Sequence, residues 1–250
     1  MDPEYARRYR ELYERHWWWR AREQFVLETV RRHIPKGGSR SILDVGCGDG
    51  LLFDRLAELG DVQGVESDAS LVGPASLHRD RIHVGPFDAS FAPAKPYGLI
   101  LMLDVIEHLQ DPVGALRHAV ELLGPAGILV ATVPAFPLLW TTHDELNHHF
   151  LRFTRRSFAA LAHRAGLHIT EATYFFHWVF PVKLAVRVGE AVRRPRPSPP
   201  PVPPPWVNEP LYWLSRLEQR LLTPLGLPFG SSLLVVGQRP NSTEATARPS

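Results

Sequence analysis

The stretch Ile42-Leu43-Asp44-Val45-Gly46-Cys47-Gly48-Asp49-Gly50 decides the fold. It reads as a short buried strand that runs into a turn with glycine at every second position, and residues 51–59 follow with apolar side chains at helical spacing. Glycine is needed where a backbone turns sharply or where another group approaches it closely. Ligands of open α/β sheets bind beyond the carboxyl ends of the strands, beside the following helices, so this turn is the first candidate for a ligand site.

The residues around the glycines favour a cationic ligand over a dinucleotide. A dinucleotide fingerprint reads G-x-G-x-x-G, and Leu51 stands where its third glycine would be. Asp44 and Asp49 place negative charge beside the turn, which opposes a pyrophosphate and suits a positively charged ligand. A plain strand–helix turn without a ligand remains the alternative.

A second acidic residue supports a nucleoside ligand. Residues 62–66 read as the next strand, and Glu66 ends it roughly 20 residues after the first glycine, the distance at which an acid reaches ribose hydroxyls in such folds. A carboxylate can accept hydrogen bonds from both hydroxyls. An ordinary solvated acid after a strand is the alternative for Glu66.

The chain resembles the class I S-adenosylmethionine-dependent methyltransferases across roughly residues 40–174 and 231–238. The glycine turn is similar to their first motif, residues 104–108 (D-V-I-E-H) to the segment after their fourth strand, and residues 124–127 to the break before their fifth. The resemblance implies an α/β, Rossmann-like doubly wound sheet of seven strands in the order 3-2-1-4-5-7-6, with strand 7 antiparallel and helical lid additions. It also implies S-adenosyl-L-methionine as methyl donor and S-adenosyl-L-homocysteine as product.

By the same resemblance, the cofactor would be held by residues after the first four strands. Asp88 matches the acid that reaches the adenine amino group, with a turn aspartate as its alternative, and Cys47 is equally a small turn residue without redox function. The expected cofactor-binding residues are Asp44, Gly46, Cys47, Gly48, Gly50, Glu66, Ser67, Asp88, Ala89, Leu103, Asp104 and His108.

Residues 134–154 form the second informative stretch. They follow the expected fifth strand and combine three histidines, two acids and an arginine with aromatic side chains, which suits an acceptor pocket. We expect His143 to act as general base, with Asp144 orienting it or His148, and His108 in reserve; Glu107 is a weaker candidate, since a carboxylate also caps a helix start. No metal is expected, because no metal-binding spacing occurs, and a solvated surface loop is the alternative. The expected substrate-binding residues are Trp18, Trp19, Phe136, Trp140, His148 and Arg152.

Three consecutive tryptophans, Trp17–Trp19, lie within a helical pattern over residues 4–33. They cannot all face one side of a helix, so at least one is exposed or covered by another segment or a ligand. A packed Trp-rich seam, a lid over an apolar substrate and a helix lying on an anionic membrane are the three interpretations.

One methyltransferase domain is expected over residues 1–238. It comprises an N-terminal helical lid (1–35), the cofactor-binding core (36–174), a helical and proline-rich insertion (175–230) and the last strand (231–238), with a disordered tail at 239–250. Within the insertion, residues 195–205 are mostly proline and read as an exposed polyproline spacer, and residues 209–222 as an amphipathic helix.

The amino-acid composition limits the kinds of partner and the compartment that we expect for this protein. The net charge of +2, from 28 basic and 26 acidic residues among 250, does not favour nucleic acid. The single Cys47 excludes an internal disulfide framework. Without a signal-peptide pattern or an apolar run of about 18 residues, we expect a cytoplasmic protein without stable membrane insertion, although peripheral contact is compatible with the sequence. The oligomeric state stays open.

The expected function is methyl transfer to a small-molecule acceptor, through a hydroxyl of an apolar, lipid-linked or sugar-containing metabolite. A non-catalytic S-adenosylmethionine-binding module and an NAD-dependent oxidoreductase are the alternatives. The intact glycines and Glu66 speak against the first, and Leu51 against the second.

Overall fold

A computed structural model describes residues 3–34, 40–73, 76–193 and 200–240, with the backbone alone at 3–8 and 192–193. The chain forms two compact units. We call the first the helical unit; it comprises Met1–Arg32, Val133–Arg155 and Thr173–Leu234. We call the second the sheet unit; it comprises His33–Thr132, Arg156–Ala172 and Val235–Ser250.

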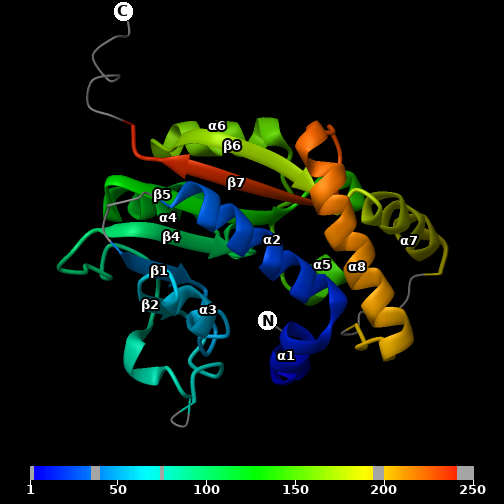
Figure 1. Ribbon diagram of the computed structural model, residues 1–250, viewed down its shortest axis with the longest axis horizontal. Helices are drawn as coiled ribbons and strands as arrows, with labels where there is room; N and C mark the ends of the chain where they lie inside the picture. Colours follow the sequence, from blue (N-terminus) through cyan, green and yellow to red (C-terminus); the bar gives the residue numbers. More distant parts are fainter. Residues whose placement is uncertain (1–2, 35–39, 74–75, 194–199, 241–250) are drawn as a thin grey trace, which may run out of the picture. The chain divides into compact units, whose positions relative to one another are not determined.

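Seven strands form one sheet in the order β3-β2-β1-β4-β5-β7-β6, and Figure 1 shows β7 running opposite to β6. The pairs β1–β2, β1–β4, β2–β3 and β4–β5 are parallel. The fold class and strand order predicted from the sequence are therefore confirmed. The strands are β1 (Ser41–Val45), β2 (Asp61–Glu66), β3 (Ile82–Val84), β4 (Tyr97–Leu103), β5 (Leu123–Pro134), β6 (His168–Phe175) and β7 (Ser232–Gln238).

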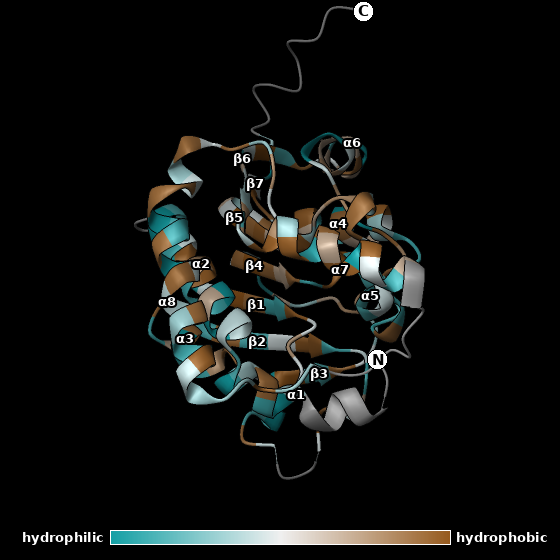
Figure 2. Ribbon diagram, turned by 90° about the vertical axis from the view of Figure 1, so that its right-hand side faces the viewer, coloured by the Kyte–Doolittle hydropathy of each residue, from teal (hydrophilic) through white to brown (hydrophobic). Residues whose placement is uncertain are grey.

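The central strands owe their position to continuous apolar runs. Six of the seven residues of β4 are buried, as expected of a parallel strand covered on both faces. Figure 2 shows α3 (Phe53–Ala57) on one side of the sheet, and α4 (Pro112–Leu122) and α6 (Arg155–Ala165) on the other. α4 begins after Asp111, whose side chain caps the helix by accepting a hydrogen bond from Gly114 N at 2.9 Å.

The helical unit holds most of the remaining helices. Its longest are α2 and α8, and α8 precedes the short turn that leads to β7. The helices are α1 (Pro3–Arg15), α2 (Trp17–His33), α5 (Thr142–Leu146), α7 (Val179–Arg193) and α8 (Pro205–Leu221), with 3-10 turns η3 (Pro137–Leu139) and η4 (Thr223–Leu225). The sheet unit carries η1 (Arg79–Arg81) and η2 (Ile106–His108).

Two local expectations need correction. The helix expected over residues 4–33 is interrupted at His16, whose Nδ1 accepts a hydrogen bond from Trp18 N at 3.1 Å and so starts α2 afresh. The helix expected over 51–59 is reduced to α3 because the glycine turn extends through residue 52.

The insertion is more helical than expected. α8 begins at Pro205, four residues earlier than predicted, because proline fits the first turn of a helix, where no backbone donor is needed. The proline-rich spacer falls partly, and the tail mostly, outside the described residues. The boundaries proposed for the single domain stay a prediction.

Candidate functional site

The glycine turn has the geometry of a backbone that a ligand can approach. Gly46, Gly48 and Gly50 all have positive φ, at +71°, +57° and +85°. A Cβ on Gly46 would lie 2.6 Å from Val105 Cγ2, and one on Gly50 would lie 2.9 Å from His78 Cδ2. A Cβ on Gly48 would have no heavy atom within 4 Å. Packing thus requires two of the glycines, whereas Gly48 leaves its backbone open on one side.

Glu66 is fixed to this turn. Its side chain is buried, with Oε2 accepting from Gly48 N at 2.9 Å and Oε1 accepting from Asp68 N at 2.8 Å. Each carboxylate oxygen has a further lone pair, so the same group can still accept from a ligand hydroxyl. The contact with ribose hydroxyls that the sequence predicts for Glu66 stays a prediction.

Cys47 has the environment of a packed turn residue. A Cβ on Gly64 would collide with its Sγ, so the thiol occupies space that only glycine leaves free. Burial raises the pKa of the Cys47 thiol far above its usual range, and the negative charges of Asp44 and Glu66 add to this. The thiol is protonated at neutral pH, and a protonated thiol is a poor nucleophile.

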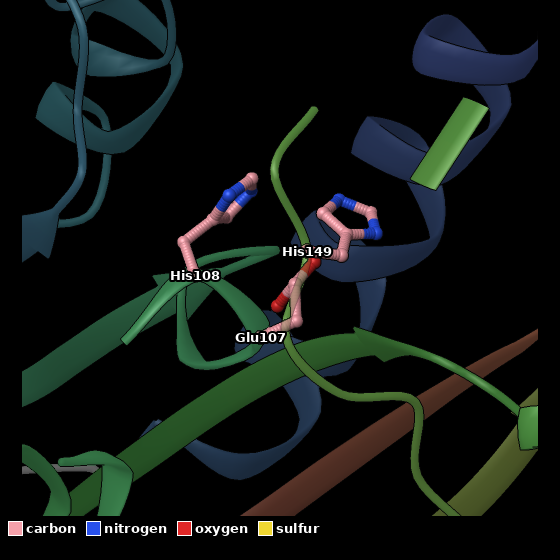
Figure 3. A group of neighbouring side chains, drawn as sticks. All are labelled: Glu107, His108 and His149. Carbon is pink, nitrogen blue, oxygen red and sulfur yellow. The ribbon is translucent and has the colours of Figure 1, made fainter. Parts of the chain in front are cut away.

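The loop after β4 carries the next group of candidates. Asp104 adopts a φ of +55°, and its Oδ1 accepts a hydrogen bond from Thr132 Oγ1 at 3.0 Å. Glu107 is fully buried, whereas His108 and Leu103 are half-buried. Figure 3 shows the side chains of Glu107 and His108 on η2.

Asp88 lies in an exposed local turn. Its Oδ1 accepts from Ser90 Oγ at 2.6 Å and from Ser90 N at 2.9 Å, and these hydrogen bonds lower its pKa. Such contacts are typical of a turn aspartate. Ser67 and Ala89 are also exposed. The adenine contact assigned to Asp88 stays a prediction.

In the helical unit, Asp144 is the centre of a buried network. Arg152 donates to both of its oxygens, from Nε at 2.8 Å and from an Nη at 2.9 Å, and His149 Nδ1 lies 2.8 Å from Oδ1. Thr141 N donates to Oδ2 at 2.9 Å, which completes a capping box at the start of α5. Burial alone would raise the pKa of Asp144, but the hydrogen bonds from His149 and Arg152 outweigh it and hold the pKa well below its usual range.

Arg152 is therefore engaged inside the protein. Besides Asp144, it binds the carbonyl of Ala135 at 2.9 Å, and its side chain is buried. The side-chain hydrogen-bond partners of Asp144 are Thr141, His149 and Arg152. An orienting effect of Asp144 on His143 or His148 stays a prediction. His148 is exposed, with a φ of +54°.

His143 lies on α5, half-buried beside Asn147 and His149. The carbonyl of His143 accepts from Asn147 Nδ2 at 2.8 Å, and the rings of His143 and His149 are 6.5 Å apart. Burial lowers the pKa of His143 to about 3, and the charge of Lys183 adds to this. Asn147 Nδ2 also lies 3.2 Å from Nε2 of the ring. The imidazole is thus neutral at physiological pH, and it is a weak base.

The aromatic candidates pack against one another. Trp17 and Trp18 lie 6.0 and 5.6 Å from Phe176, and Trp17 also lies 5.2 Å from Trp178. Trp19 is buried against Leu12. The segment after β6 thus covers the tryptophans, which are packed as in the seam interpretation, and their action as a lid stays a prediction. Phe136 stacks on Tyr174 at 4.9 Å, and Trp140 is half-buried.

Comparison with known proteins places the chain in a family. A family model described as a methyltransferase domain matches residues 18–172, more than half of the chain. The chain belongs to this methyltransferase family. Together with the strand order, the match confirms the prediction of a class I S-adenosylmethionine-dependent methyltransferase, a family of enzymes whose methyl donor is S-adenosylmethionine.

Curated relatives of this methyltransferase include small-molecule enzymes. It is 33% identical over 110 residues to a ubiquinone biosynthesis O-methyltransferase of Bradyrhizobium diazoefficiens, and the aligned region covers 42% of this chain and 43% of the relative. It is 24% identical over 200 residues to the protein of the same name in Aromatoleum aromaticum, and the aligned region covers 68% of this chain and 84% of that relative. The match spans about half or less of the length of the former and of several other such relatives.

A solved structure shares the fold. The TehB-like S-adenosylmethionine-dependent methyltransferase of Corynebacterium glutamicum has a TM-score of 0.54 at 20% identity, over 95% of this chain and 97% of that one. In the described part of this methyltransferase, no helix is both long and apolar enough to cross a bilayer.

Sequence reasoning missed several residues that shape these regions. His78 packs on Gly50 and lies 5.2 Å from the ring of Phe53, and Val105 packs on Gly46. In the helical unit, His149 holds Asp144, and Glu190 accepts from the backbone and hydroxyl of Thr142 at 3.0 and 2.8 Å. These contacts join residues without characteristic spacing, so no sequence pattern identifies them.

Proposed function

We propose that this methyltransferase binds S-adenosylmethionine through the sheet unit and transfers its methyl group to a hydroxyl of a small apolar, lipid-linked or sugar-containing metabolite. The observation that carries the proposal is the hydrogen bond between Glu66 and Gly48 N. It places a carboxylate with spare lone pairs beside the one glycine of the turn whose backbone is open. Ribose hydroxyls and a flat nucleoside fit that combination.

The charge of the turn fits a cationic donor. Asp44, Glu66 and Asp104 are carboxylates at the ends of β1 and β2 and after β4, and Asp44 and Glu66 are buried. A pyrophosphate would be repelled by these groups, whereas a sulfonium and an ammonium group would be attracted. When bound, S-adenosylmethionine supplies a methyl carbon that its sulfonium activates toward attack by a lone pair.

The protein's own task is then alignment and removal of one proton. The acceptor oxygen forms a bond to the methyl carbon while the carbon–sulfur bond breaks, and the hydroxyl proton passes to a base. Alignment can supply several kcal/mol, and a positioned base about 10²–10⁴-fold in rate. We assign the base to His143, with His108 in reserve.

The low pKa of His143 limits which kinds of acceptor hydroxyl this side chain can deprotonate. An imidazole whose pKa is about 3 is a weak base and cannot efficiently deprotonate an aliphatic alcohol. A phenol, with a pKa of about 10, loses its proton far more readily. We therefore favour a phenolic hydroxyl. Oxygen as the accepting atom agrees with the O-methyltransferase names of the curated relatives.

Calorimetric titration with S-adenosylmethionine and, separately, NAD tests the donor. We expect micromolar binding of the first alone. Glu66→Gln should weaken it about tenfold or more, because a charged acceptor is lost. Glu58→Gln, which alters an exposed acid in the same unit, is the matched control. Binding of NAD alone would support an oxidoreductase instead, and binding of neither would overturn the proposed donor.

Transfer of a labelled methyl group tests the acceptor. Apolar phenols and apolar aliphatic alcohols are compared as acceptors, and we expect turnover with phenols. His143→Ala should abolish this turnover while donor affinity is unchanged. Equal turnover in wild type and variant would remove His143 from the mechanism and turn attention to His108.

A further inference from the structure

Helix α8 has the opposite polarity to that of a helix packed on a protein core. Its buried side chains are all polar. Its exposed side chains are apolar except for Arg220. After Pro205 at its start, the exposed apolar residues of the helix are Trp206, Pro210, Trp213, Leu214, Leu217 and Leu221, which follow helical spacing and form one stripe. We call these six residues the α8 stripe.

The buried polar face explains how α8 stays attached to its unit. Asn208 accepts from Trp17 N at 2.9 Å and donates to Arg15 O at 2.8 Å. Glu218 accepts from Trp178 N at 3.0 Å, and Arg216 pairs with Glu28. The helix is thus anchored by hydrogen bonds, and its apolar area remains available for another contact.

The stripe is strongly exposed. Trp206 is 78% exposed, Trp213 61%, Leu217 55% and Leu221 59%. Just beyond the helix, Leu225 is 68% exposed. Isolated exposed apolar residues are ordinary, but a contiguous exposed row with two tryptophans marks a contact surface.

The charge around the stripe points to an anionic partner. In the described side chains of α7 and α8, the exposed charged groups are Arg187, Arg220 and Glu209, whose side chain is 47% exposed and paired with Arg20. The acids of these helices are engaged within the unit: Glu209 with Arg20, Glu190 with Thr142, and Glu218 with Trp178. Along the sequence, residues 191–208 contain three arginines and no acidic residue.

The composition favours a lipid surface over a protein. Tryptophan and leucine beside arginine are typical of helices that lie in the interface of an anionic bilayer, where indole rings sit at the level of the headgroups. A helix of 17 residues is about 25 Å long and lies along such a surface without crossing it. α7 contributes further exposed apolar side chains, at Val182, Val186 and Val188.

We propose that the α8 stripe docks this methyltransferase onto the surface of an anionic lipid bilayer. The contact differs from the one considered for the N-terminal tryptophans, because those are packed against Phe176 and Trp178. It rests on the pattern of α8 and is independent of which hydroxyl is methylated. An apolar acceptor dissolved in a bilayer would gain access to the enzyme by such docking.

Vesicle flotation of the full chain tests this proposal, with no donor or acceptor present. We expect the protein to float with vesicles of phosphatidylcholine and phosphatidylglycerol, and more weakly with phosphatidylcholine alone. The double variant Leu217→Ser/Leu221→Ser should lower the partition coefficient about tenfold or more. Leu77→Ser, which changes a leucine that is 80% exposed outside the stripe, is the matched control and should float like wild type.

A second, more conservative variant removes one positive charge from α8. Arg220→Gln should lower binding to the anionic vesicles about fivefold, and added salt should weaken wild-type binding. Thermal unfolding of each variant identifies any variant that fails to fold. If the double variant does not fold, the vesicle binding of Arg220→Gln and the salt dependence of wild-type binding test the proposal.

Three outcomes would overturn the docking surface. The wild type fails to float with anionic vesicles, or the double variant floats as well as wild type. In the third outcome, sedimentation shows that the wild type is a dimer and the double variant a monomer, and neither protein binds the vesicles. That result would make the stripe an interface between two copies of this chain.

Discussion

At the scale of single residues, the three glycines of the turn have different functions. Gly46→Ala places a methyl group against Val105 and Gly48→Ala places it in open space, although both substitutions force alanine into positive φ at about 1–2 kcal/mol. We expect Gly46→Ala to lose a further 1–3 kcal/mol or so of unfolding free energy through overpacking. Gly48→Ala should instead weaken S-adenosylmethionine about tenfold or more, a loss of about 1.4 kcal/mol.

Thermal unfolding and donor titration of the two variants separate these effects. Equal losses of stability would contradict the steric distinction. Unchanged donor affinity in Gly48→Ala would place the ligand elsewhere than against this backbone.

Asp144 makes a residue-scale prediction about pH. Its carboxylate is buried and bound to Arg152 and His149, so Asp144→Asn leaves Arg152 without its charge partner and should cost about 3–5 kcal/mol at neutral pH. The folded pKa is depressed, so this stabilisation is present above the unfolded value of about 4 and is lost as the pH falls below it. Urea unfolding from pH 7 to pH 3 should show wild type and variant converging; a gap that stays constant would rule out the ionised network.

At the scale of elements, the two faces of α8 predict opposite responses. Asn208→Ala removes two buried hydrogen bonds and should lower the free energy of unfolding by about 1–3 kcal/mol. Leu217→Ser changes an exposed side chain and should stay within about 0.5 kcal/mol. Denaturant unfolding of both variants tests this, and a large loss in Leu217→Ser would mean that the stripe is covered within the protein.

Sequence patterns predicted the elements whose causes are local. The glycine turn after β1 acts within a few residues, and it was predicted correctly. The break at His16 was missed because it depends on a buried, neutral ring, and burial lowers the pKa of His16 to about 4. The orientation of α8 was missed because an amphipathic pattern does not say which face is buried.

The same limit applies to the candidate sites. Glu66 was identified because strand ends and glycine spacing fix its place relative to Gly48. The partners of Asp144 were not, because His149 and Arg152 reach it through a loop whose path no periodicity describes. For Asp88 the sequence position matches a motif, whereas the hydrogen bonds of its side chain go to the neighbouring Ser90.

At the scale of the whole molecule, the expected donor-binding residues all lie in the sheet unit, and all those expected to bind substrate lie in the helical unit. Donor binding should therefore stabilise the protein without help from an acceptor. A ligand at 100 times its Kd adds about 2.7 kcal/mol to the free energy of unfolding, which for a chain of this size raises Tm by about 5–10 °C.

Gly48→Ala should lose this increase in Tm at the same donor concentration, whereas His143→Ala should retain it, because the first variant changes the glycine turn expected to bind the donor and the second does not. Differential scanning fluorimetry with S-adenosylmethionine, and with NAD as the ligand control, measures all three proteins side by side. An increment lost in both variants would show that donor binding needs His143 as well, and the assignment of donor and acceptor to separate units would fail.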